Sequence, residues 1–207
     1  MSLRIYTEPT EEIVSIEDAR LHLRLDGEGS SNGHPDDTLI DAMLGAAREW
    51  AELYLARSIA QKTYELALDS FPSDEIELLM PPIQSITSVQ YVDTAGALQT
   101  LAADQYSLDK KTEPGWLFPA DGTEWPETAE VVNAVTIRYV AGYSPPNDSE
   151  QAYPLPKSLR AGVLLLLHDL YENRGNAGDK VINAGASTEV PFAAQMVMGF
   201  KRLGMGV

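Results

Sequence analysis

The chain has no cysteine among its 207 residues. Disulfide bonds, thiolate nucleophiles and cysteine-ligated metal sites are therefore excluded. It also lacks an HExxH zinc-protease pattern. The stretch "GSSNG" (29–33) fits the letters of a GxSxG serine-hydrolase pattern, but it lies in a predicted loop with no strand before it and so lacks the context of a nucleophile elbow. The Gly-rich stretch "GEGSSNG" has neither the lysine of a P-loop nor a strand before it. The common sequence signatures of an enzyme are thus absent.

Basic residues are scarce and scattered. Fifteen Lys and Arg stand against 31 Asp and Glu, which gives a formal net charge of −16. Binding of nucleic acid through a basic patch is poorly supported by such a composition. The acidic excess favours solubility, and it suits a surface past which nucleic acid moves without sticking.

Long apolar runs are also missing. The N-terminal stretch "MSLRIYTEPTEE" lacks the apolar segment of a signal peptide. The longest apolar run, residues 162–167, is far too short to span a bilayer, so we expect no membrane association. A hydrophobic fraction of 44% and a charged fraction of 22% are typical of a soluble globular protein with a real core.

Helical patterns lie towards both ends of the chain. Ser15 followed by Asp18 resembles a capping box and predicts a helix over 16–25. A long amphipathic helix is predicted over 37–57, and a third begins near Pro156 and ends near 173. A short last helix is expected within "FAAQMVMGFKRLG". Loops or linkers are predicted at 27–36, 110–128, 144–156 and 174–190.

The middle of the chain alternates with the period of a strand. "VVNAVTIRYVAGY" is the strongest strand, with Val135, Ile137 and Tyr139 on one face. "ITSVQYVDTAGALQTL" predicts a hairpin that turns at residues 93–96. The order predicts an α+β fold, with a mainly helical body built from both chain ends and a small antiparallel β-region inserted in it. The corresponding boundaries are 1–62, 63–143 and 144–207.

Two clusters of polar residues are candidates for chemistry. In "LLLLHDLYENRG" (164–175), His168 and Glu172 share one helix face beside Asp169, which suits a metal or an acid–base pair. The motif has only one His, so a polar helix side is the alternative. Glu124 and Glu127 flank Trp125 and either line a pocket or belong to a solvated loop. We expect no catalytic residue, metal ligand or cofactor-binding residue.

The apolar surfaces of the predicted helices are the feature of the sequence that points to a role, namely association with another chain. The predicted third helix is apolar almost all round, so it is buried inside its own domain or covered in part by a second chain. The stripe on residues 39–55 is wide and carries aromatic residues of the types enriched at interfaces. The subunit-interface candidates are Trp50, Tyr54, Leu166, Leu170, Tyr171, Glu172 and Arg174.

A series of landmarks covers nearly the whole chain in order. They are "SIEDARLHLRLD", "DDTLIDAMLGAAREWAELYLARSIAQKTYEL", "SFP", "MPPIQSITSVQYVDTAGALQTL", "WP", "VTIRYVAGY", "LPKSLRAGVLLLLHDLYENRG" and "VPFAAQMVMGFKRL". In their order and spacing the chain resembles the head-to-tail connector (adaptor) proteins of long-tailed bacteriophages and prophages. The last segment departs most, because it keeps Lys201 and Arg202 but is rich in Met.

The resemblance implies a structural role in virion assembly rather than an enzyme activity, and no cofactor. Such connectors form a homo-oligomeric ring beneath the portal, extend the DNA channel and present a platform to later head-completion or tail-joining proteins. The implied location is the virion head–tail junction, and the bacterial host cytoplasm during assembly. The charge of −16 suggests that an acidic channel face repels DNA and lets it slide without specific binding.

Two other readings stay open on the sequence. One is a hydrolase of unknown substrate, metal-assisted or not, with an acid-lined pocket between the helical body and the β-region. The other is a monomeric binding module that uses the β-region as a platform for a peptide or a carbohydrate.

Overall fold

The chain divides into two compact units. The computed structural model describes residues 1–25, 33–144, 153–174 and 192–199. A β-unit consists of Met1–Thr10 with Ala56–Ser144, and a helical unit consists of Glu11–Leu55 with Pro145–Val207. The predicted linker at 144–156 and the predicted loops at 27–36 and 174–190 fall mostly outside the described residues, as do Lys201 and Arg202.

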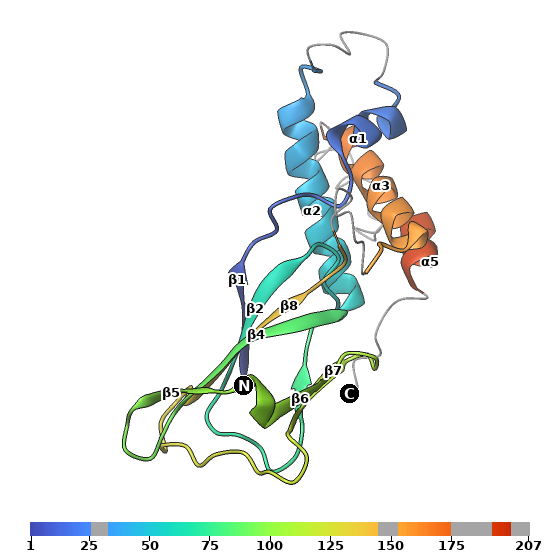
Figure 1. The fold of residues 1–207 in the computed structure, drawn as a ribbon. Helices are drawn as coiled ribbons and strands as arrows, with labels where there is room; N and C mark the ends of the chain where they lie inside the picture. Colours follow the sequence, from blue (N-terminus) through green and yellow to red (C-terminus); the bar gives the residue numbers. More distant parts are fainter. Residues whose placement is uncertain (26–32, 145–152, 175–191, 200–207) are drawn as a thin grey trace, which may run out of the picture. The chain divides into compact units, whose positions relative to one another are not determined.

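The main sheet of the β-unit has five antiparallel strands (Figure 1). Their order across the sheet is β1-β2-β8-β4-β5, so the last strand in the sequence lies at the centre. The strands are β1 (Ser2–Thr7), β2 (Lys62–Leu68), β4 (Ile83–Val92), β5 (Leu98–Leu101) and β8 (Val135–Ala141).

β8 is the strand that the sequence predicts most strongly, and its predicted faces are confirmed. Val135, Ile137, Tyr139 and Ala141 are buried, and the residues between them are half-buried. Its inward side chains therefore follow the two-residue period of a strand with one face on a core. β8 pairs with β2 from Lys62 opposite Ala141 to Leu68 opposite Val135, and it pairs with β4 on its other side.

A smaller sheet completes this core. It has three antiparallel strands in the order β3-β7-β6, formed by β3 (Ile76–Leu78), β6 (Tyr106–Asp109) and β7 (Gly115–Pro119). A 3₁₀-helix, Ala103–Gln105, precedes β6. Buried side chains of both sheets form one hydrophobic cluster: Tyr64, Leu66, Ile76, Leu78, Ile83, Val89, Leu117, Val135, Ile137, Tyr139 and Ala141.

The predicted hairpin is confirmed as β4 and β5. Its turn is held by Asp93, whose Oδ1 accepts hydrogen bonds from the backbone N–H groups of Ala95 and Ala97. Gly96 follows with a φ of +82°, a conformation that glycine adopts without a Cβ penalty. An Asp and a Gly at these positions are the reason why the sequence predicts a turn here.

The helical unit contains four described α-helices. They are α1 (Ile16–Leu23), α2 (Asp37–Leu55), α3 (Lys157–Glu172) and α5 (Phe192–Gly199). The side chain of Ser15 caps α1 by accepting a hydrogen bond from the Asp18 N–H, which confirms the predicted cap. α3 packs against each of the other three helices and contributes Leu159, Val163 and Leu167 to the interior. None of the described helices combines the length and apolarity needed to cross a bilayer.

The prediction of a mainly helical body with a small β-region is wrong. The described residues form eight strands in two antiparallel sheets, which makes this a sheet-rich α+β fold. The N-terminal segment is not helical: β1 pairs with β2 at the edge of the main sheet. The sequence hides this strand because its side chains are largely exposed, so no buried face imposes an alternating pattern.

Gly142, directly after β8, lies in close contact with the backbone of Ala60. Its φ is +110°, and a Cβ there would overlap the backbone carbonyl oxygen of Ala60. We expect Gly142→Ala to lower the free energy of unfolding by about 3 kcal/mol or more, because strain and a backbone clash add. Denaturant unfolding at unchanged m-value measures the loss.

Gly96→Ala is the matched control for that substitution. Gly96 also has a positive φ, but a Cβ added there would meet no other atom within 4 Å. The expected loss is therefore only about 1 kcal/mol, from backbone conformation alone. Equal losses in the two variants would show that close packing at Gly142 is unimportant.

Candidate functional site

The C-terminal end of α3 is fastened to the start of α2. The Tyr171 hydroxyl donates a hydrogen bond of 2.6 Å to Oδ2 of Asp36, and this bond raises the pKa of Tyr171 above its ordinary value. The guanidinium carbon of Arg174 lies 4.0 Å from the centroid of the Tyr171 ring, within cation–π range. Arg174 also approaches Asp36, with 4.0 Å between Nη2 and Oδ2. Tyr171 and Arg174, two of the interface candidates, thus have partners within the same chain.

The other candidate residues on α3 differ in exposure. Leu166 is 6% exposed and belongs to the interior of the helical unit, whereas Leu170 is 39% exposed. Glu172 is exposed at the helix end. The assignment of these residues to a subunit interface stays a prediction.

α2 carries two apolar stripes, and only one of them is in the interior. Ile40, Leu44, Ala47, Ala51 and Leu55 are buried. A second stripe runs beside the first, and three of its members are exposed, with Leu53 at 78%. We call it the open stripe; it comprises Leu39, Met43, Ala46, Trp50 and Leu53.

The open stripe has the spacing of a helix-packing seam. Its residue numbers advance by 4, 3, 4 and 3, which is the heptad pattern that places side chains along one side of a helix. Trp50 stacks on Tyr54, with ring centroids 5.1 Å apart and planes 17° apart. Two interface candidates, Trp50 and Tyr54, thus form a preorganised aromatic patch beside exposed apolar residues.

A buried ion-pair cluster on α2 is absent from the sequence predictions. Arg48 is buried, and its Nε lies 3.0 Å from Oε2 of Glu12. Its Nη1 lies 3.0 Å from Oε2 of Glu52, which is also buried. The cluster ties the segment before α1 to α2. The signal that could have revealed it is the spacing of four between Arg48 and Glu52 on one helix face.

The candidate metal or acid–base cluster does not assemble. His168 is exposed, and its nearest ring is that of His22 on α1, with centroids 5.9 Å apart and planes at 86°. Asp169 is occupied at the helix end, where its carbonyl and carboxylate accept hydrogen bonds from the Asn173 side chain. Across the described ranges, no group of three or more His, Asp or Glu side chains is placed to hold a metal ion.

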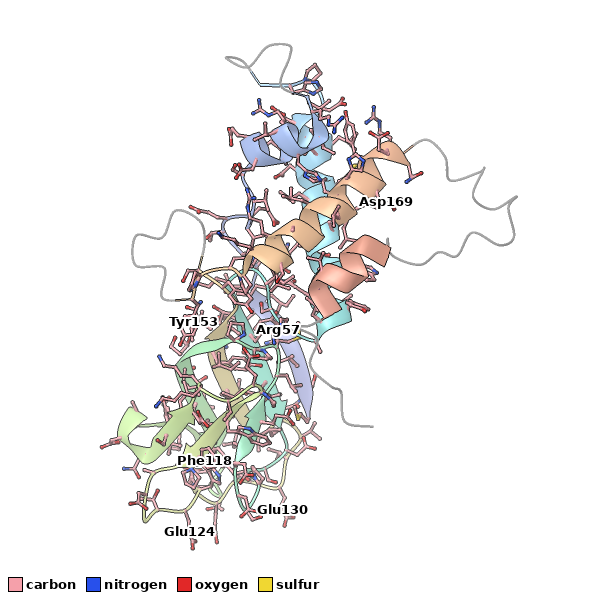
Figure 2. All side chains as sticks on the ribbon, turned by 90° about the vertical axis from the view of Figure 1, so that its right-hand side faces the viewer. Arg57, Phe118, Glu124, Glu130, Tyr153 and Asp169 are labelled. Atoms are coloured by element: carbon pink, nitrogen blue, oxygen red, sulfur yellow. The ribbon has the colours of Figure 1, made fainter. Side chains whose placement is uncertain are left out.

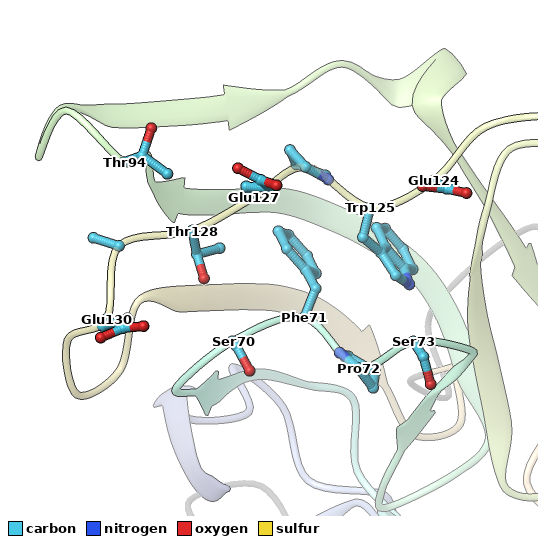
Figure 3. A pocket seen from close by; sticks show the side chains of 12 residues that line it. Ser70, Phe71, Pro72, Ser73, Thr94, Glu124, Trp125, Glu127, Thr128 and Glu130 are labelled. Atoms are coloured by element: carbon cyan, nitrogen blue, oxygen red, sulfur yellow. The ribbon is translucent and has the colours of Figure 1, made fainter.

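The "WPETAE" segment lines a hollow on the β-unit of about 880 Å³ (Figure 3). Phe71 and Trp125 stack at its centre, with ring centroids 4.9 Å apart and planes 3° apart. Trp125 is anchored because its Nε1–H donates a hydrogen bond of 2.7 Å to the carbonyl of Asp74. Glu124, Glu127 and Glu130 line the hollow around this pair. The general acid of a glycosidase is held in an apolar pocket, whereas these three glutamates are exposed.

Most arginines are engaged in ion pairs inside the chain. In the β-unit, buried Arg57 (labelled in Figure 2) lies 2.7 Å from Glu113 and also donates a hydrogen bond to the Tyr143 hydroxyl. Glu65 accepts hydrogen bonds from both Arg4 and Arg138. Seven of the nine arginines pair with described carboxylates: Arg4, Arg20, Arg48, Arg57, Arg138, Arg160 and Arg174.

Comparison with known proteins finds no matching family model and no matching curated protein. Among solved structures, a chain of "Virion of native gene transfer agent (GTA) particle" is 24% identical, with a TM-score of 0.76. A chain of "Neck of empty GTA particle computed with C6 symmetry" is 24% identical, with a TM-score of 0.77. A chain of "Neck of native GTA particle computed with C12 symmetry" is 21% identical, with a TM-score of 0.68.

These likenesses extend over whole chains. Each covers 100% of this chain and 98% of the other chain. The protein therefore has the fold of chains found in gene transfer agent particles, including their necks. At these identities, the likeness establishes the fold.

His22 predicts a pH dependence for the helical unit. Burial lowers its pKa below the ordinary value of 6.5, and the nearby positive charges of His168 and Arg160 lower it further. The unfolded chain then binds a proton at a higher pH than the folded chain does. We expect the free energy of unfolding to be greatest above pH 6.5 and to fall as the pH drops through the lowered pKa.

Denaturant unfolding between about pH 7.5 and about pH 5, values that bracket the ordinary histidine pKa by one unit or more, measures this effect. His22→Gln should flatten the pH dependence, and His168→Gln should weaken it by removing one neighbouring charge. An unchanged slope in His22→Gln would contradict the assignment.

Proposed function

We propose that this protein is a structural component of the head–tail junction of a phage-like particle. In this role it is a connector that forms a ring beneath the portal, extends the DNA channel and offers a platform to later joining proteins. The observation that carries the proposal is the end-to-end structural match with chains of particle necks. The order of sequence landmarks, which resembles that of connectors, supports the same role.

Ring formation is supported by the open stripe on α2. The structures of the similar neck chains were computed with C6 and C12 symmetry. A cyclic ring requires two different faces on each subunit, since each contact is heterologous. We assign the open stripe, with Trp50 and Tyr54, to one such face. The exposed end of α3, with Leu170 and Glu172, is the candidate for the other, near Leu166, Tyr171 and Arg174.

The charge distribution suits a DNA channel. The arginine pairs described above are internal, so they neutralise carboxylates of the same chain and leave the net charge of −16 uncompensated. In a ring whose lumen is acidic, DNA would be repelled from the wall and would pass without specific binding. In this proposal the protein is no enzyme. Its partners are the portal and the head-completion or tail-joining proteins, and it assembles in the host cytoplasm.

Electron microscopy and light scattering of the concentrated protein, alone and with the portal, test the proposed function. Closed rings, or a stoichiometric complex with the portal, are the expected result. A strict monomer at every concentration that also fails to bind the portal would overturn the proposal.

Leu53→Asp tests the open stripe. Leu53 is already exposed, so we expect the change in free energy of unfolding to stay within about 0.5 kcal/mol. Ring assembly should be lost, because the subunit contact would have to bury an unpaired carboxylate. Leu98→Asp, the same change at an exposed leucine of β5, is the matched control and should assemble normally. Normal assembly of Leu53→Asp would remove the stripe from the interface.

A further inference from the structure

The hollow around Phe71 and Trp125 continues into a longer groove. A second hollow of about 510 Å³ lies along residues 128–132. The two share Ser70, Thr128, Ala129 and Glu130 in their linings. We call the combined surface the β-groove. All of it belongs to the β-unit, and Figure 2 shows Glu124 and Glu130 on its loops.

The floor of the β-groove is apolar and is held by contacts within the β-unit. Phe71 is held between two rings, with the Tyr91 ring 5.8 Å away and the Trp125 ring stacked at 4.9 Å. The loop beside it is tied to the main sheet, since the Ala129 N–H donates to the Val92 carbonyl. At the far end Val132 is 80% exposed. An aromatic floor beside the exposed pair Val131 and Val132 provides contiguous apolar surface of the kind that another chain covers.

All the charged residues that line the β-groove are acidic. Glu124, Glu127, Glu130 and Asp69 surround the floor, and no lysine or arginine is among the lining residues. Within the described part of the chain, none of these four carboxylates forms an ion pair with a basic side chain. Figure 3 shows Glu127 and Glu130 on either side of Thr128, with Glu127 on the side of Phe71. The groove thus combines apolar contact area with uncompensated negative charge.

We propose that the β-groove binds an extended segment of a different protein, in which lysine or arginine alternates with apolar residues. The apolar residues of such a segment would cover Phe71, Trp125 and Val132. Its cationic side chains would pair with the rim glutamates, and an arginine could also lie over an aromatic face.

Charge decides between this occupant and the others. DNA is a polyanion and would be repelled by the rim. A second copy carries the same net charge of −16, with most of its arginines already paired internally. A metal ion is disfavoured because the described carboxylates do not converge as ligands. A basic segment of another protein complements both the charge of the rim and the apolar floor.

This inference deepens the proposed function and rests on it in one respect: the partner is taken to be another protein of the particle. The binding chemistry itself can be measured without any particle.

The test uses the full chain and a synthetic peptide of about twelve residues that alternates lysine or arginine with leucine or valine, about 40 Å when extended. Isothermal titration calorimetry should show binding that weakens as salt is raised. The combined variant Glu124→Gln, Glu127→Gln, Glu130→Gln should bind about tenfold more weakly, because three exposed ion pairs are lost. Glu77→Gln, at an exposed position on β3 outside the groove, is the matched control and should bind as the wild type does.

Several results would overturn the proposal. They are no binding of the basic peptide, equal binding of a peptide with glutamate in place of the basic residues, and wild-type affinity in the triple variant. Calcium or single-stranded DNA that binds at the rim glutamates would likewise assign the groove to a different ligand. If peptide binding persists in a protein that forms neither rings nor a portal complex, the groove stands and the connector function fails. If rings form but the triple variant binds the peptide normally, the connector function stands and the β-groove proposal fails.

Discussion

The β-unit depends on the pairing of β8 with strands on both of its sides. β8 comes last in the sequence of the unit, yet it joins β2 to β4 at the centre of the sheet. Its inward residues, Val135, Ile137 and Tyr139, also belong to the hydrophobic cluster that both sheets share. Without β8, the strands β1 and β2 would have no pairing with β4 and β5. The loop at 124–132, which lines one side of the β-groove, leads into β8, so the central strand also helps to position the groove.

Charge is organised around the scarcity of basic residues. Arginines hold segments together inside each unit: Arg48 joins Glu12 to α2, and Arg57 joins the start of the β-unit's second segment to Glu113. Each of these pairs is intramolecular, so the acidic excess remains on the rest of the molecule. An acidic surface is well suited to a role beside DNA, because repulsion keeps the nucleic acid mobile.

Two uncovered apolar surfaces differ in the partners that they fit. The open stripe of α2 is a regular heptad row with no carboxylate among its five members, which suits packing against another helix-bearing subunit. The β-groove has an aromatic floor within a rim of carboxylates, which suits a basic chain and disfavours another acidic copy. In a connector, one surface would serve assembly of the ring and the other would serve attachment of a further protein.

The sequence by itself determined the elements with strong local signals. These include the capped start of α1, the hairpin turn at Asp93 and the alternating strand β8. For the glutamates beside Trp125 the sequence left two readings open, a pocket lining and a solvated loop. Only the tertiary structure decided that residues 2–7 form an edge strand, since exposed side chains impose no pattern on the chain. It alone showed that Phe71, far earlier in the chain, stacks on Trp125, because such a contact depends on how distant strands pair and leaves no periodic trace in the sequence.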